Sequence, residues 1–76
     1  MPKYFFNVNN TRPVTDDEGE ELPNKEAAWH EATAIAGEIF KDMADRFSPG
    51  QEWCLEVADE RRKPLYNIRI NSKLIE

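Results

Sequence analysis

The feature that most constrains this sequence is one long segment, residues 24–47, whose apolar side chains recur at helical spacing. At 100° per residue these side chains form a single stripe with two aromatic residues on its flank. The stripe consists of Ala28, Ala32, Ile35, Ala36, Ile39, Met43 and Phe47, flanked by Trp29 and Phe40. Asn24 is a favourable N-cap residue, and Pro49 and Gly50 stop a helix after Phe47. The segment therefore predicts an amphipathic helix over residues 24–47.

Segments of alternating side chains surround this helix. Residues 3–8 are aromatic and β-branched and predict a strand, and residues 13–15 predict a short return strand at an edge, because Pro13 has no amide hydrogen to donate. Residues 52–58 and 64–71 alternate apolar and polar side chains and predict a hairpin. Its apolar face carries Trp53, Leu55, Val57, Tyr66, Ile68 and Ile70.

The element order is thus strand, short strand, helix, strand, strand within a single domain of residues 1–76. One apolar helix face and one apolar sheet face are buried most simply against each other. We therefore expect an α+β fold, a two-layer sandwich in which a small antiparallel sheet carries one long amphipathic helix on one face. The order of the strands in the sheet is left open.

Charge and cysteine content narrow the classes of function. Ten Lys and Arg residues against fifteen Asp and Glu residues give a net charge of −5, which disfavours binding to the phosphate backbone of nucleic acids. Cys54 is the single cysteine, so no internal disulfide can form, and the first residues lack the apolar core of a signal peptide. No apolar run approaches the roughly 20 residues that span a bilayer. We expect a cytoplasmic protein without a membrane role.

The residues that could carry chemistry are few. His30 is predicted opposite the apolar stripe and Cys54 on the outer face of the sheet, so the helix would keep this nucleophile and base apart. One Cys and one His without a CxxC or HExxH spacing fall short of a zinc site. The acidic residues 16–21 resemble a calcium loop centred on Gly19, but Val14 and Lys25 occupy two ligand positions. We expect no enzymatic activity, no cofactor and no metal.

Several motifs together resemble a family of short uncharacterised bacterial proteins, a domain of unknown function. The motifs are Tyr4-Phe5-Phe6-Asn7-Val8, Asp17-Glu18-Gly19-Glu20-Glu21-Leu22-Pro23, the alanine-rich helix, and Val57-Ala58-Asp59-Glu60 before Pro64-Leu65. Such proteins usually carry a glycine in the turn after Asp-Glu, where this chain has Arg61, Arg62 and Lys63. The resemblance implies the same fold and a bacterial cytoplasm, and it implies no activity.

Two groups of residues are candidates for an interaction surface. A helix of about 22 residues extends about 33 Å, whereas strands of six or seven residues extend about 20–24 Å. One helix end should therefore overhang the sheet and offer Trp29 or Phe47 to a protein partner or to a second copy of the chain. Alternatively, Arg61, Arg62 and Arg69 with Phe5 as a stacking surface could bind a small ligand or, weakly, nucleic acid. We expect a non-enzymatic interaction or regulatory module.

Overall fold

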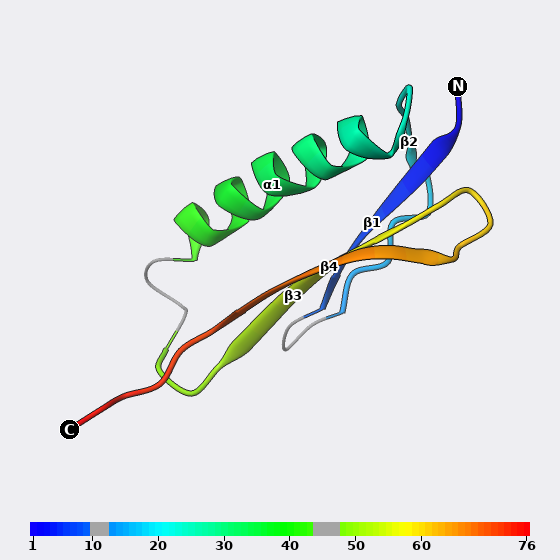
Figure 1. Ribbon diagram of the computed structural model, residues 1–76. Helices are drawn as coiled ribbons and strands as arrows, with labels where there is room; N and C mark the ends of the chain where they lie inside the picture. Colours follow the sequence, from blue (N-terminus) through cyan, green and yellow to red (C-terminus); the bar gives the residue numbers. More distant parts are fainter. Residues whose placement is uncertain (10–12, 44–47) are drawn as a thin grey trace.

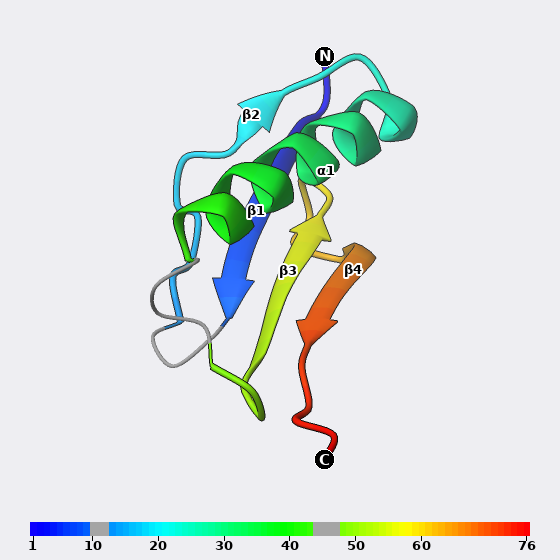
Figure 2. The ribbon, with the colours of Figure 1, turned by 90° about the vertical axis from the view of Figure 1, so that its left-hand side faces the viewer.

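The computed structural model describes residues 1–9, 13–43 and 48–76. Its elements are β1 (Lys3–Asn9), β2 (Glu20–Glu21), α1 (Lys25–Asp42), β3 (Glu52–Ala58) and β4 (Pro64–Asn71). All strand pairs are antiparallel, and the sheet has the order β2-β1-β3-β4. The helix lies across one face of the sheet, as Figures 1 and 2 show. The expected α+β sandwich is confirmed, and the strand order is now known.

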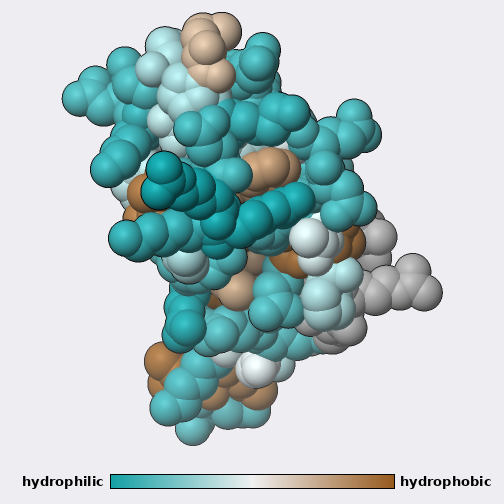
Figure 3. Space-filling view, turned by 90° about the vertical axis from the view of Figure 1, so that its right-hand side faces the viewer, coloured by the Kyte–Doolittle hydropathy of each residue, from teal (hydrophilic) through white to brown (hydrophobic). Residues whose placement is uncertain are grey.

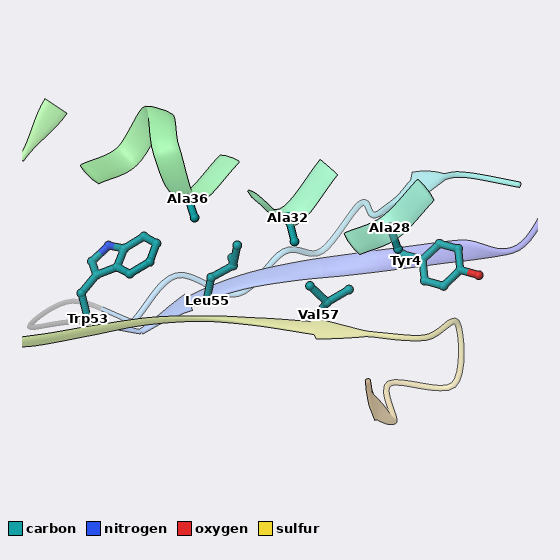
Figure 4. Packing of buried hydrophobic residues seen from close by; sticks show 7 residues of the cluster. All are labelled: Tyr4, Ala28, Ala32, Ala36, Trp53, Leu55 and Val57. Carbon is teal, nitrogen blue, oxygen red and sulfur yellow. The ribbon is translucent and has the colours of Figure 1, made fainter. Parts of the chain in front are cut away.

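The core lies between α1 and the two central strands. Ala28, Ala32 and Ala36 are buried on the helix, one turn apart. They face Trp53, Leu55 and Val57 of β3 and Tyr4 of β1 (Figure 4). Because alanine has only a methyl group, the helix backbone can approach these large side chains closely. Ile35, Ile39 and Met43 of the expected stripe are partly buried beside this cluster, as are Tyr66, Ile68 and Ile70 of the hairpin.

The helix begins where the sequence indicates but ends earlier. The Asn24 side chain accepts a hydrogen bond from the Ala27 amide at 2.9 Å, which is the N-cap interaction expected of it. The helix then ends at Asp42, and the amide of the cap residue Met43 donates to the Phe40 carbonyl. The predicted end at residue 47 lies outside the described residues. An apolar stripe shows where a helix can bury a face and does not fix where its hydrogen bonding stops.

The predicted overhang of the helix is wrong for the described residues. Eighteen helical residues extend about 27 Å, and strands of seven and eight residues extend about 23–27 Å. The two layers are therefore matched in length. Phe47, one of the two aromatic residues expected at an overhanging end, lies outside the described residues.

The strand expected at residues 13–15 is reduced to one bridge. The backbone groups of Val14 exchange two hydrogen bonds with those of Val8, at 2.8 and 3.0 Å. At the next position along the edge, the Phe6 amide donates to the Asp16 carboxylate, and the Asp16 amide donates to the Asn7 side chain. Side chains thus replace the backbone ladder there. The second strand forms later, where Glu20 and Glu21 pair with Tyr4 and Lys3.

The alanine face of α1 generates a prediction about stability. Ala32 is fully buried, so Ala32→Leu should force the helix away from β3 and lower the free energy of unfolding by about 1–3 kcal/mol. Ala34→Leu, on the exposed side of the same helix, should change it by about 0.5 kcal/mol or less. Urea unfolding followed by circular dichroism measures both. Equal effects of the two substitutions would show that the helix does not pack on its alanines.

Candidate interaction surface

An apolar surface runs along the flank of α1 that borders β4. Trp29 is 41% exposed although its ring lies 5.2 Å from that of Tyr66, and Phe40 is 47% exposed. Phe40 follows Trp29 by eleven residues, about three helical turns, so both lie on one flank. Ile68 and Ile70 of β4 are half-buried on the same face of the sheet. We call these five residues, Trp29, Phe40, Tyr66, Ile68 and Ile70, the α1–β4 surface.

At one end this surface is hollowed into a shallow pocket of about 330 Å³. Glu26, Trp29 and His30 on the first turns of the helix and Tyr66 on β4 line it. The Tyr66 hydroxyl donates to the Lys25 carbonyl at 3.2 Å, which ties the start of the helix to the start of β4. Trp29 thus packs beside Tyr66 and is exposed on the flank of the helix, not at an overhanging end.

The opposite face of the sheet is covered mainly by hydrophilic side chains (Figure 3). Phe5 points to this face but is only 7% exposed. The Arg62 guanidinium lies 3.6 Å from the centre of its ring, and Gly19 lies against its edge, where a Cβ would be 2.9 Å from Phe5 Cε1. Phe5 and Arg62 are thus neighbours, as expected. However, the ring is already occupied by the protein's own cation, so the stacking surface expected at Phe5 is not open.

Asp16 holds this arrangement together. Its carboxylate accepts hydrogen bonds from the amides of Phe6, Glu18 and Gly19 at 3.0–3.1 Å, and its carbonyl accepts one from Arg62 Nη1 at 2.8 Å. Burial by itself raises the pKa of this carboxyl, but the three amides and the Arg62 charge outweigh it and leave the pKa below its ordinary value. The acidic residues 16–21, expected as a solvated turn, therefore contain a structural carboxylate.

The turn between β3 and β4 is closed in the same way. Asp59 Oδ1 accepts hydrogen bonds from the amides of Arg61 and Lys63, both at 2.9 Å. Arg62 has a φ of 66°, a left-handed conformation that favours glycine. The chain thus forms a tight turn with an arginine at the position that glycine would fill with less strain. The contacts of Arg62 with Phe5 and Asp16 are the evident compensation.

Arg69 is separated from the other candidate arginines. It is exposed and lies opposite Cys54, which in turn lies opposite Asn9, whereas Phe5 lies opposite Ala58 at the other end of β3. Four residues of strand separate the two positions by about 13 Å. Arg69 lines a second pocket of about 350 Å³ on the outer face, together with Cys54, Glu56 and Asn67. The structure therefore does not bring Phe5, Arg62 and Arg69 into one site.

The edges of the sheet differ in charge. At the β2 edge, burial, a hydrogen bond with the Glu31 carboxyl and repulsion from its charge raise the pKa of Glu20. At the other edge, β4 itself carries Arg69 and no Asp or Glu. Of the basic residues in the preceding turn, Arg62 reaches away from this edge to Phe5 and Asp16.

The residues weighed for catalysis are not brought together. His30 is on the helix, whereas Cys54 lies on the outer face of the sheet, because its neighbours Trp53 and Leu55 face the helix. Within residues 1–9, 13–43 and 48–76, no three His, Cys, Asp or Glu side chains form a group that could hold a metal ion. No helix in the described part of the chain is long and apolar enough to span a bilayer.

Comparison with known proteins adds the family. The family model described as "Domain of unknown function (DUF6894)" matches residues 3–71. The chain belongs to this family. No curated protein and no solved structure matches it. The match covers every helix and strand of the described structure, so this fold is the fold of a DUF6894 domain, and the expected membership of a family of unknown function is confirmed.

The Asp16 carboxylate should make stability depend on pH. Its pKa is lowered in the folded state, so its contribution is present above the ordinary pKa and is lost as the pH falls through the folded value. Asp16→Asn should lower the free energy of unfolding by about 1–2 kcal/mol at pH 7 and by much less at pH 3. Asp17→Asn, at the exposed neighbour, is the control. Urea unfolding at pH 7, 5 and 3 tests this, and an Asp16→Asn effect independent of pH would contradict it.

The conformation of Arg62 can be tested by two substitutions. Arg62→Ala and Arg62→Gly both remove the contacts with Phe5 and Asp16, but only glycine also relieves the positive φ. The glycine variant should therefore be more stable than the alanine variant by about 1 kcal/mol, with both below the unmodified protein. Thermal unfolding measures the order. Equal stabilities of the two variants would show that the left-handed turn does not persist in solution.

Proposed function

We propose that this protein is a non-enzymatic interaction module that binds a protein partner through the α1–β4 surface. Trp29 and Phe40 are exposed on one flank of the helix, beside the half-buried apolar residues of the edge strand β4, and this exposure is the main support for the proposal. Large aromatic side chains held in place at a surface are typical of the residues that dominate binding energy in protein interfaces. The separation of His30 from Cys54 supports a binding role over a catalytic one.

The expected setting of this module is a bacterial cytoplasm. Its family resemblance supports a bacterial source, and a single half-buried cysteine is compatible with a reducing compartment. The partner in this proposal is another protein or a second copy of the chain.

Capture from a lysate of the source organism tests the function. A tagged chain should retain a partner from the lysate. The amount of partner retained should be at least about tenfold lower for the double variant Trp29→Ser/Phe40→Ser, because interface aromatics carry a large share of binding energy. Val14→Ser removes a comparably exposed apolar side chain at the β1 edge and is the matched control. Circular dichroism should show that all three chains are folded.

Two outcomes would contradict the proposal. One is a partner held equally by the double variant and by the control, because the α1–β4 surface would then not be involved. The other is enzymatic turnover that requires Cys54 or His30. Sedimentation at about 100 µM separates the two kinds of partner, because a second copy would double the mass without any added protein.

The second candidate function rests on the outer-face pocket. Arg69 and Asn67 are among the residues that line this volume of about 350 Å³, and they could hold a small anionic ligand. Arg62 would not contribute, because its guanidinium is engaged with Phe5 and Asp16. Loss of a ligand on Arg69→Gln, with no effect of the Trp29→Ser/Phe40→Ser variant, would favour this candidate.

A further inference from the structure

The backbone hydrogen bonds of the sheet show which amide and carbonyl groups of β4 do not pair with β3. Val8 directs both its amide and its carbonyl to Val14, away from β3. Along an antiparallel strand these directions alternate, so Asn7 directs its groups to β3. Asn7 lies opposite Glu56, and Glu56 therefore directs its groups to β1. The next residues of β3 must point the other way, to β4.

The same alternation continues across β4. Leu55 directs its backbone groups to its partner Ile68, so Ile68 is bonded to β3. Asn67, Arg69 and Asn71 then direct their amides and carbonyls away from β3. Because β4 is the last strand in the order β2-β1-β3-β4, no described strand receives these groups. The chain thus presents three residues of strand backbone at an open edge.

The side chains along this edge are of two kinds. On the helix side, Ile68 and Ile70 continue into the α1–β4 surface. On the outer side, Arg69 is exposed, and no hydrogen bond or ion pair of its side chain is found among the described residues. β4 carries no Asp or Glu, so Arg69 is the one charged side chain of this strand. A strand added here would place alternate side chains against an apolar surface and against a polar face that carries Arg69.

We propose that the open edge of β4 binds an extended segment of a partner protein in which apolar and acidic side chains alternate. This inference rests on the proposed interaction function and specifies the partner. Backbone pairing with Asn67, Arg69 and Asn71 gives affinity, the α1–β4 surface receives the apolar side chains, and Arg69 selects the acidic ones. On its other edge β4 already pairs with a strand of this pattern, since β3 reads Glu-Trp-Cys-Leu-Glu-Val-Ala.

Charge favours an acidic segment of a partner protein over a second copy of the chain as the strand that pairs with β4. Antiparallel pairing of two β4 strands would bring together two strands that each carry Arg69 and no Asp or Glu. Like charges placed opposite each other destabilise a strand pair, and a charged side chain on an edge strand, here Arg69, is one of the ways in which proteins prevent such self-pairing. An acidic strand is attracted where a second β4 is repelled.

A synthetic peptide tests the proposal on the whole chain. The probe is the fluorescein-labelled peptide Glu-Leu-Glu-Leu-Glu-Leu-Glu, and its controls are the same composition in the order Glu-Glu-Leu-Leu-Leu-Glu-Glu and an alternating Lys-Leu peptide. Fluorescence anisotropy should show binding of the probe and at least about tenfold weaker binding of both controls. Hydrogen exchange followed by NMR should show the amides of Asn67, Arg69 and Asn71 becoming protected when the probe is added.

Variants and modified probes locate the contacts. Arg69→Glu should weaken probe binding about tenfold at low salt, and this effect should shrink at 0.5 M NaCl. Arg61→Gln changes an exposed charge in the turn and should alter affinity about twofold or less. N-methylation of alternate residues of the probe should abolish binding for one set of positions and spare it for the other, because one edge of a strand faces β4. This last readout needs no variant to fold.

Several results would overturn the proposal. They are equal binding of the probe and the reordered peptide, binding without protection of the three amides, tighter binding of single-stranded RNA than of the probe, or protection that rises with protein concentration alone, which would assign the edge to a second copy. If the probe fails while a partner is still lost on Trp29→Ser/Phe40→Ser, the interaction function survives and its strand-pairing mechanism does not.

Discussion

The contact between three alanines of α1 and the large side chains of β3 sets the height of the helix above the sheet. Ala28, Ala32 and Ala36 allow the helix backbone to lie close to Trp53, Leu55 and Val57, which are fully buried. Burial of such large side chains is the main source of stability in a domain of this size. A helix about 10 Å wide covers about two strands spaced 4.8 Å apart, so it leaves the side of the sheet at β4 partly open.

The outer face is organised without a second helix. Phe5 is a large apolar residue on this face, and it is enclosed by Gly19 on one side and the Arg62 guanidinium on another. Asp16 connects the same pieces by hydrogen bonds to β1, to its own turn and to Arg62. One carboxylate and one guanidinium thus join three segments that are distant in sequence. This gives a small domain a second, polar centre of packing.

The sequence predicts well what depends on periodicity and poorly what depends on single side chains. The alternation of Trp53, Leu55 and Val57 gives the hairpin strands with their bounds, and the spacing of the alanines gives the buried helix face. The replacement of a strand by Asp16 could not be derived from periodicity, because a side chain takes the place of backbone partners there. A signal existed, since an Asp three residues before a Gly is typical of a turn capped by its side chain.

In the candidate site, too, the features that follow from periodicity are predictable from the sequence and the others are not. Exposure of Trp29 follows from its place on the helix flank, which the sequence gives directly. The burial of Phe5 does not follow, because alternation assigns it to the outer face without revealing that Arg62 reaches it from a turn 57 residues later. The open edge of β4 also depends on the strand order, which no pattern within a strand determines.

The two edges of the sheet therefore have different capacities for growth. At the β1 edge, a single bridge at Val14, the Asp16 side chain and the two residues of β2 occupy the backbone in short, irregular pieces. Such an edge is a poor template for a further strand. Of its own two edges, the chain therefore offers a regular one only at β4. Repeated copies of this chain would need two such edges to stack into one continuous sheet, so the fold does not favour that kind of filament.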